Sequence, residues 1–230
     1  MARYEITKSL IEAWYYTFDC WEGQEESAYE DFLRALRREP PLLSEDQAQS
    51  IQNGIDFEKL VTDIATGTFK PEWEGSGQIN PSTYGDGEEM GHYVYPKWYR
   101  AASEFGSLLK DAQFQVRIHR PITVKGIEFE IHGVLDALRE GVIYDIKFKN
   151  KSFGSLDLAG SYLGCSQHPF YFYLVPEARK FLYLVSDGND IYIEQYTPEE
   201  SRNAWDVIAE FVDFLESAGL MDLYKEHWAV

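Results

Sequence analysis

The stretch Phe129-Glu-Ile-His-Gly-Val-Leu-Asp136, followed by Val142-Ile-Tyr-Asp-Ile-Lys147, decides the fold. Both segments are rich in β-branched, aromatic and other apolar residues, which is typical of strands with a buried face. Glu140-Gly141 lies between them and predicts a short turn. We therefore expect two neighbouring antiparallel strands at the centre of the chain.

Outward from this hairpin, the apolar spacing predicts helices before the sheet and a mixture of strands and helices after it. Further strands are expected over 113–120, 122–125, 181–186 and 191–196. Helices are expected over 7–20, 25–38, 44–67, 97–109, from 166, and over 198–217. The order indicates an α/β fold with a mixed central β-sheet flanked by helices and an N-terminal helical region.

Local signals set the expected divisions of a single domain. Thr7 is a candidate N-cap, and Ser44 with Gln47 fits a capping box. We expect a helical part over 1–67, a long loop or lid over 68–95, a core over 96–197 and an acidic C-terminal helix over 198–230. Pro198 is expected to open that last helix.

Composition excludes several classes of protein. The 230 residues are 44% hydrophobic, enough for a core, and contain no apolar run of about 18 residues that would predict a membrane span. The first residues lack the apolar centre of a signal peptide, so we expect a cytoplasmic protein. Two cysteines cannot form a disulfide framework or hold a zinc ion or iron–sulfur cluster by themselves.

The charge is unevenly distributed along the chain. The formal net charge is −18, which alone argues against binding a polyanion. However, residues 117–151 contain seven basic and five acidic side chains, whereas residues 186–230 contain two basic and eleven acidic ones. The middle of the chain can therefore still face nucleic acid, and the acidic C-terminal part can repel it or bind a partner protein.

The central hairpin also carries a candidate site. Asp145 and Lys147 are two positions apart and share a strand face, and Asp136 ends the neighbouring strand. Carboxylates and a backbone carbonyl, here that of Ile146, are the oxygen ligands that Mg²⁺ or Mn²⁺ prefers. Such an ion stabilises negative charge on a phosphoryl group and lowers the pKa of bound water, while the lysine can stabilise the attacking hydroxide.

Gly133-Val-Leu-Asp136 with Asp145-Ile-Lys147 resembles the G-x-x-D…(D/E)-x-K signature of PD-(D/E)XK nucleases. Gln167-His-Pro-Phe-Tyr171 is similar to the Q-x-x-x-Y motif of the RecB-like and lambda-exonuclease-like branch, in which these residues lie on the helix after the catalytic strands. Gly54-Ile-Asp-Phe-Glu58 resembles the helical motif that supplies another metal ligand, with Glu58 as the match and Asp56 as its rival.

The resemblance implies a restriction-endonuclease-like core and a Mg²⁺- or Mn²⁺-dependent deoxyribonuclease, either an exonuclease or an enzyme that prefers single strands. It implies DNA as a partner. The implied catalytic residues are Asp136, Asp145, Lys147, Gln167 and Tyr171. The implied metal ligands are the carboxylates of Glu58, Asp136 and Asp145 and the carbonyl of Ile146. A recombination or repair protein is a candidate second partner, and recombination, repair and defence, often phage-encoded, are candidate settings. No cysteine follows Cys165, so we expect no iron–sulfur cluster.

Other interpretations of the same residues stay open. Asp136 and Asp145 could cap turns, Lys147 could form a structural ion pair, and Gln167 and Tyr171 could be ordinary helix residues. His132 could be a metal ligand or an exposed histidine. At the level of function, the chain could be an inactive nuclease-fold binding protein with a DNA-mimicking acidic surface, or a nuclease for RNA.

Overall fold

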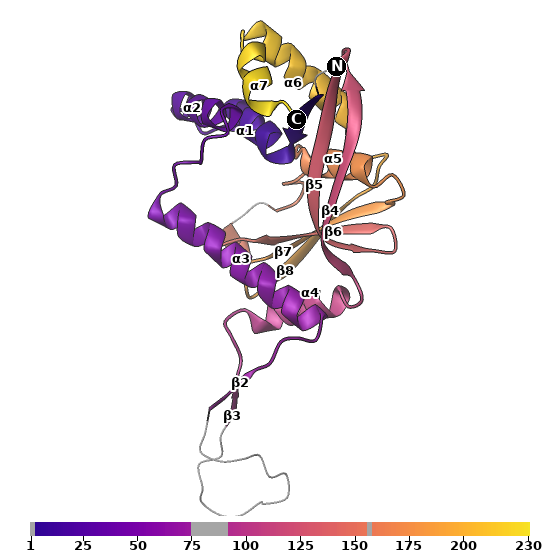
Figure 1. Cartoon of the computed structure of the whole chain (residues 1–230). Helices are drawn as coiled ribbons and strands as arrows, with labels where there is room; N and C mark the ends of the chain where they lie inside the picture. The colour runs from indigo at the N-terminus through magenta and orange to yellow at the C-terminus, as the bar shows by residue number, and fades with distance from the viewer. Residues whose placement is uncertain (1–2, 75–91, 156–157) are drawn as a thin grey trace, which may run out of the picture.

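The computed structural model describes residues 3–74, 92–155 and 158–230 (Figure 1). It shows the expected α/β architecture, with a mixed six-stranded sheet and helices on both of its faces. The strands are β1 (Arg3–Thr7), β4 (Gln113–Val124), β5 (Ile127–Arg139), β6 (Val142–Phe148), β7 (Lys180–Ser186) and β8 (Ile191–Tyr196). The helices are α1 (Lys8–Asp19), α2 (Glu25–Leu36), α3 (Glu45–Ala65), α4 (Tyr99–Leu108), α5 (Gln167–Leu174), α6 (Ala204–Ser217) and α7 (Met221–Trp228).

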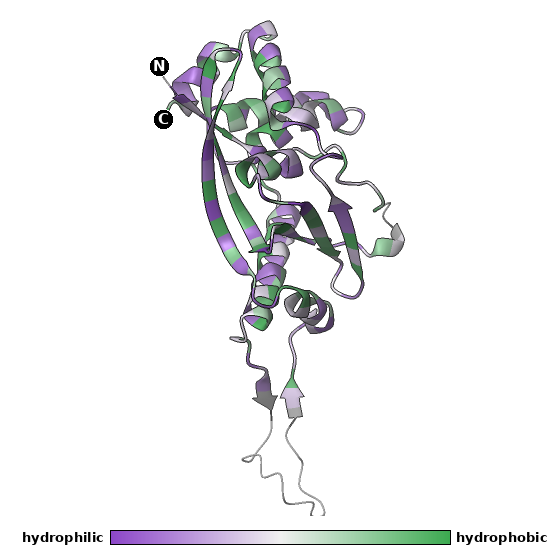
Figure 2. Cartoon of the chain, turned by 90° about the vertical axis from the view of Figure 1, so that its right-hand side faces the viewer, coloured by the Kyte–Doolittle hydropathy of each residue, from purple (hydrophilic) through white to green (hydrophobic). Residues whose placement is uncertain are grey.

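The predicted central hairpin is confirmed and belongs to a three-stranded meander of β4, β5 and β6. The two turns, Lys125-Gly126 and Glu140-Gly141, each have positive φ at both residues, as two-residue hairpin turns require. The long β4–β5 hairpin shows alternating hydrophilic and hydrophobic bands (Figure 2). Strand β7 then runs parallel to β6, and β8 returns antiparallel to β7.

Alternation along β6 and β7 sends side chains into two cores. Ile143, Phe181 and Tyr183 join the larger core, which is built with α1, α2, α5, α6 and α7. Tyr144 and Leu184 join a smaller core under α3 and α4. The sheet is therefore covered on both sides, which explains why these strands are nearly continuous runs of apolar residues.

Strand β5 has different partners along one of its edges. Its first part pairs in parallel with β1, from Arg3 opposite Glu128 to Thr7 opposite His132. Its last part pairs with β6, starting at Ala137 opposite Tyr144. Between these two ladders, residues 133–136 of β5 face a fork in the sheet, and the candidate site lies there.

Several expected boundaries were wrong. Strand β1 precedes the first helix, and Pro121 does not divide β4, because proline is tolerated in a strand that pairs on one edge only. Pro198 does not open the last helix; the side chain of Asn203 caps α6 instead, and α7 follows as a separate helix.

Other local expectations were confirmed, and one is only partly described. The side chain of Thr7 caps α1, and the capping box of Ser44 and Gln47 opens α3. In the expected loop over 68–95, short strands β2 (Glu72–Glu74) and β3 (His92–Val94) pair with each other. Residues 75–91 lie outside the described residues. No helix in the described ranges has both the length and the apolar character needed to cross a bilayer.

Candidate active site

The fork between β1 and β6 contains a cavity of about 600 Å³. All seven residues predicted for the site line this cavity: Glu58, Asp136, Asp145, Ile146, Lys147, Gln167 and Tyr171. Asp136 and Asp145 lie next to the last paired residues of β5 and β6, where these two strands separate. All of the predicted positions therefore meet in one place.

Asp136 stands where the β5–β6 ladder ends. Ala137 is the last β5 residue toward the fork that is paired with β6, so no backbone group of β5 opposes Ile146. The Asp136 carboxylate replaces that partner, since its Oδ2 accepts the Ile146 N–H at 2.8 Å. This contact fixes the carboxylate beside the strand that carries the second acid.

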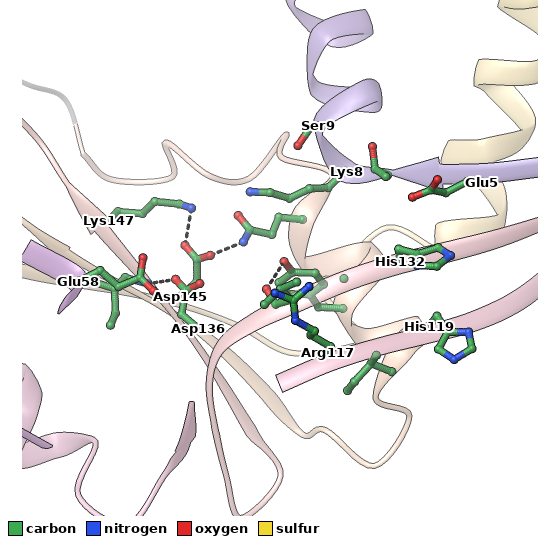
Figure 3. Close-up of a pocket in the computed structure, with 17 residues that line it drawn as sticks. Glu5, Lys8, Ser9, Glu58, Arg117, His119, His132, Asp136, Asp145 and Lys147 are labelled. Atoms are coloured by element: carbon green, nitrogen blue, oxygen red, sulfur yellow. Dashed lines mark hydrogen bonds and ion pairs between the residues drawn. The ribbon is translucent and has the colours of Figure 1, made fainter. Parts of the chain in front are cut away.

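Asp145 is buried, with 2% of its surface exposed, and is held from two sides (Figure 3). Its Oδ2 lies 2.6 Å from Nζ of Lys147, and its Oδ1 accepts a hydrogen bond from the carboxamide of Gln167. A buried carboxylate is costly unless it is paired and hydrogen-bonded, and both conditions are met here. The same-face placement of Asp145 and Lys147 predicted from their spacing is confirmed.

Gln167 and Tyr171 share one face of α5, as their four-residue spacing predicts. The Tyr171 hydroxyl donates to the Val134 carbonyl at 2.8 Å, which satisfies a β5 group in the fork. Gly133 makes this approach possible, because a Cβ there would lie 2.8 Å from Cε1 of Tyr171 and 2.5 Å from Cδ1 of Leu174. In this structure, the glycine of the signature has a packing role.

The two candidate acids of α3, Asp56 and Glu58, differ in exposure and in position. Asp56 is exposed and accepts a hydrogen bond from Gln52 on its own helix, whereas Glu58 is half-buried and lines the cavity. Oε1 of Glu58 accepts a hydrogen bond of 2.6 Å from Nε2 of Gln115 on β4. Glu58 is therefore the α3 carboxylate that faces the two aspartates.

The three carboxylates repel one another. Burial, followed by the charges of Asp145 and Glu58, raises the pKa of Asp136 to about 8. Burial and the charge of Asp145 also raise the pKa of Glu58. Burial alone would lower the pKa of Lys147, but the adjacent Asp145 carboxylate outweighs it, so the pKa is raised and the ammonium stays charged. The cavity thus holds more negative charge than Lys147 balances.

Apart from His132, sequence patterns did not identify the residues of the opposite wall of the cavity. Lys8 and Ser9 from the start of α1 line it, as does Arg117 from β4 (Figure 3). His119 and His132 stand directly opposite each other on β4 and β5, with ring centroids 5.6 Å apart. The signal for Arg117 was the alternation of β4, whose odd-numbered residues face outward from 113 to 119. Lys8 had no such signal, since the β1–β5 pairing brings it there.

The donor set suits a hard divalent cation in part. Oε1 of Gln167 is buried and accepts no hydrogen bond, and Oδ2 of Asp145 has the Lys147 ammonium beside it without a hydrogen bond of normal geometry. Within the described ranges, no three His, Cys, Asp or Glu side chains form a ready-made metal cluster. Magnesium commonly binds through one or two carboxylates and keeps several waters, so two aspartates suffice without such a cluster.

Comparison with known proteins gives little further information. No protein-family model matches the chain, and no curated protein matches it. A crystal structure of SSO0001 is similar at 15% sequence identity with a TM-score of 0.46, over 93% of this chain and 75% of that one. A similarity this distant carries no argument about function.

Proposed function

We propose that the chain is a divalent-cation-dependent nuclease that hydrolyses phosphodiester bonds in DNA. The observation that carries this proposal is the fork in the sheet, where Asp136, Asp145 and Lys147 meet in one cavity. Two acids and a lysine from adjacent strands, with excess negative charge between them, suit a cation and a phosphoryl group better than they suit the interior of a stable fold.

Four oxygen donors are available for Mg²⁺ or Mn²⁺: the carboxylates of Asp136, Asp145 and Glu58, and the carbonyl of Ile146. The N–H of Ile146 faces Asp136, and in an antiparallel pair the N–H and C=O of one residue point toward the same neighbour. When bound, the cation would stabilise charge on the phosphoryl oxygens and make bound water more acidic.

The remaining residues support the reacting groups. Lys147 lies at the cavity wall, and its raised pKa keeps the ammonium group protonated. Its positive charge would stabilise the negative charge that develops on the phosphoryl group. The Gln167 carboxamide orients Asp145, and its buried Oε1 can accept a hydrogen bond from water. Tyr171 holds α5 against β5, so its contribution is to position Gln167.

The opposite wall supports a polyanionic substrate. Lys8 and Arg117 line it, and a cavity of about 600 Å³ is large enough for a nucleotide unit as well as a cation. These cations face the carboxylate cluster across the cavity (Figure 3). The overall charge of −18 does not prevent this, because contacts to individual phosphates depend on the local side chains.

The test is DNA degradation as a function of Mg²⁺ and Mn²⁺. We expect cation-dependent cleavage that is lost in Asp145→Asn and in Lys147→Ala. Glu58→Gln should be impaired, whereas Asp56→Asn, an exposed acid on the same helix, is the matched control and should cleave as wild type does. Undiminished cleavage by both Asp145→Asn and Lys147→Ala would refute the proposal. A parallel RNA substrate at the same salt concentration tests the choice of DNA.

The second candidate is an inactive binding protein with the same fold. Two observations favour it: no ready-made cluster of three metal-binding side chains occurs in the described part of the chain, and the formal net charge of the chain is −18. Calorimetry with Mn²⁺ separates the two functions. A cation site with the wild-type residues should give binding heat that disappears in Asp145→Asn, and an inactive scaffold should give none.

A further inference from the structure

Gln115 has an unusual backbone for a strand residue. It lies within β4 with φ of +51°, in the left-handed region that glycine and asparagine adopt more easily than glutamine. The other non-glycine residues with positive φ in the described ranges border helices or occupy turns. A strained residue inside a strand persists only where its surroundings hold it in place.

The position of this residue relates it to the candidate site. Its neighbours Phe114 and Val116 pair with Ala137 and Leu135, so Gln115 stands opposite Asp136. Its side chain donates to Oε1 of Glu58 at 2.6 Å. The left-handed backbone at Gln115 thus lies opposite Asp136, and the Gln115 side chain contacts Glu58.

The contact links two separate parts of the fold. Glu58 is carried by α3, whereas the other site acids are carried by the sheet. Asp145 repels Glu58, and a half-buried glutamate can relieve that repulsion by rotating toward solvent. A neutral donor from β4 opposes this rotation without adding positive charge that would compete for a cation.

We propose that Gln115 is a positioning residue, which keeps the Glu58 carboxylate turned into the acid cluster. The inference rests on the proposed function for the role of Glu58, but the contact itself does not depend on a cation. Gln115 is exposed and belongs to neither hydrophobic core, whereas its neighbours Phe114 and Val116 pack against the smaller and the larger core, respectively. Outer contacts of this kind commonly change metal affinity by 10- to 100-fold when they are removed.

Two substitutions separate the effect of losing the Gln115–Glu58 contact from the effect of the left-handed backbone at position 115. Gln115→Gly removes the side chain and suits the positive φ, so the urea midpoint should not fall. Gln115→Asn also tolerates this backbone and keeps the carboxamide, but it is one methylene too short to reach Glu58. Glu140→Gly is the control, because Glu140 has φ of +51° in a turn and does not line the cavity.

The first measurement is calorimetry of the full chain with Mn²⁺ alone. Both Gln115 variants should bind about 10-fold more weakly than wild type, and Glu140→Gly should bind equally well. A double-mutant cycle tests whether Gln115 acts on cation binding through Glu58. If it does, Gln115→Gly should weaken binding no further in a Glu58→Gln background. Wild-type affinity in both Gln115 variants, or full additivity in the cycle, would overturn the inference.

The second measurement needs no cation. A crystal structure of metal-free Gln115→Gly should show the Glu58 carboxylate rotated out of the cavity, and an unmoved Glu58 would overturn the inference. If wild type itself shows no heat with Mn²⁺, the proposed function fails, and this structure still decides whether Gln115 positions Glu58.

Discussion

Replacing Asp136 with asparagine should stabilise the metal-free protein at alkaline pH. Asp136 accepts the Ile146 N–H through one oxygen, and the asparagine carbonyl can accept the same hydrogen bond. The substitution therefore removes the negative charge and keeps the local geometry. It removes the cost of burying a charged carboxylate and the repulsion from Asp145 and Glu58, which in that order raise the pKa of Asp136.

The magnitude follows from that pKa. An acid whose pKa rises from 3.8 to about 8 in the native state costs about 6 kcal/mol of stability once the pH is above both values. The penalty is absent below the lower pKa, where both states hold the proton. It grows as the pH rises from the lower to the higher value and is complete above the higher one. Water and counterions that enter the cavity reduce it, so we expect Asp136→Asn to be about 2–4 kcal/mol more stable than wild type at pH 8.5.

The assay is urea denaturation in a chelator at several pH values from 5 to 8.5. The stability difference between Asp136→Asn and wild type should be below about 1.5 kcal/mol at pH 5 and should widen toward alkaline pH. Asp56→Asn, at an exposed position, should show no such trend. Parallel stability profiles for wild type and Asp136→Asn would refute the argument that burial and repulsion make the ionised Asp136 carboxylate destabilising.

Three further outcomes are expected. Gly133→Ala should lower stability by about 1–3 kcal/mol and reduce cleavage, because the added methyl would clash with Tyr171 and Leu174; unchanged melting would contradict the packing role of this glycine. Lys147→Met should destabilise the protein by about 2–3 kcal/mol at pH 7 in urea titrations, since it leaves Asp145 buried without its counterion, and equal stability would show that the pair is energetically neutral. Burial lowers the pKa of His168 to about 4, so the contribution of the neutral imidazole to stability is complete above about pH 6.5 and is lost as the pH falls toward 4. Over this range the free energy of unfolding of wild type should fall by up to about 3 kcal/mol more than that of His168→Phe. Equal decreases in the two proteins would argue against a buried neutral imidazole.

Local patterns were sufficient for the central part of the fold. The hairpin of β5 and β6 was predictable because alternation, β-branched residues and a Glu-Gly turn agree within a short stretch. The convergence of Asp136, Asp145 and Lys147 follows from that hairpin alone, since it depends on strand periodicity and on one turn. The site residues on α5, Gln167 and Tyr171, came from the resemblance to the Q-x-x-x-Y motif, and their four-residue spacing predicted only the shared helix face.

Features that depend on distant pairing were not predictable. The segment Arg3–Thr7 is short and leads directly into a helix, so its extended form is apparent only from its pairing with β5. The position of Lys8 at the cavity depends on the same pairing. Gln115 resembles any polar residue of a half-exposed strand, and no sequence rule predicts a left-handed backbone for glutamine. Tertiary contacts decided each of these features.

The parallel pairing of β1 with β5 has a consequence for how the molecule acquires its structure. Arg3 is opposite Glu128, so about half of the chain must be present before this ladder can close. Closing so large a loop is entropically expensive, and contacts of high sequence separation form slowly. Lys8 and Ser9 reach the cavity only after that step, and we therefore expect the β5–β6 hairpin to form early in refolding and the complete cleft to form late.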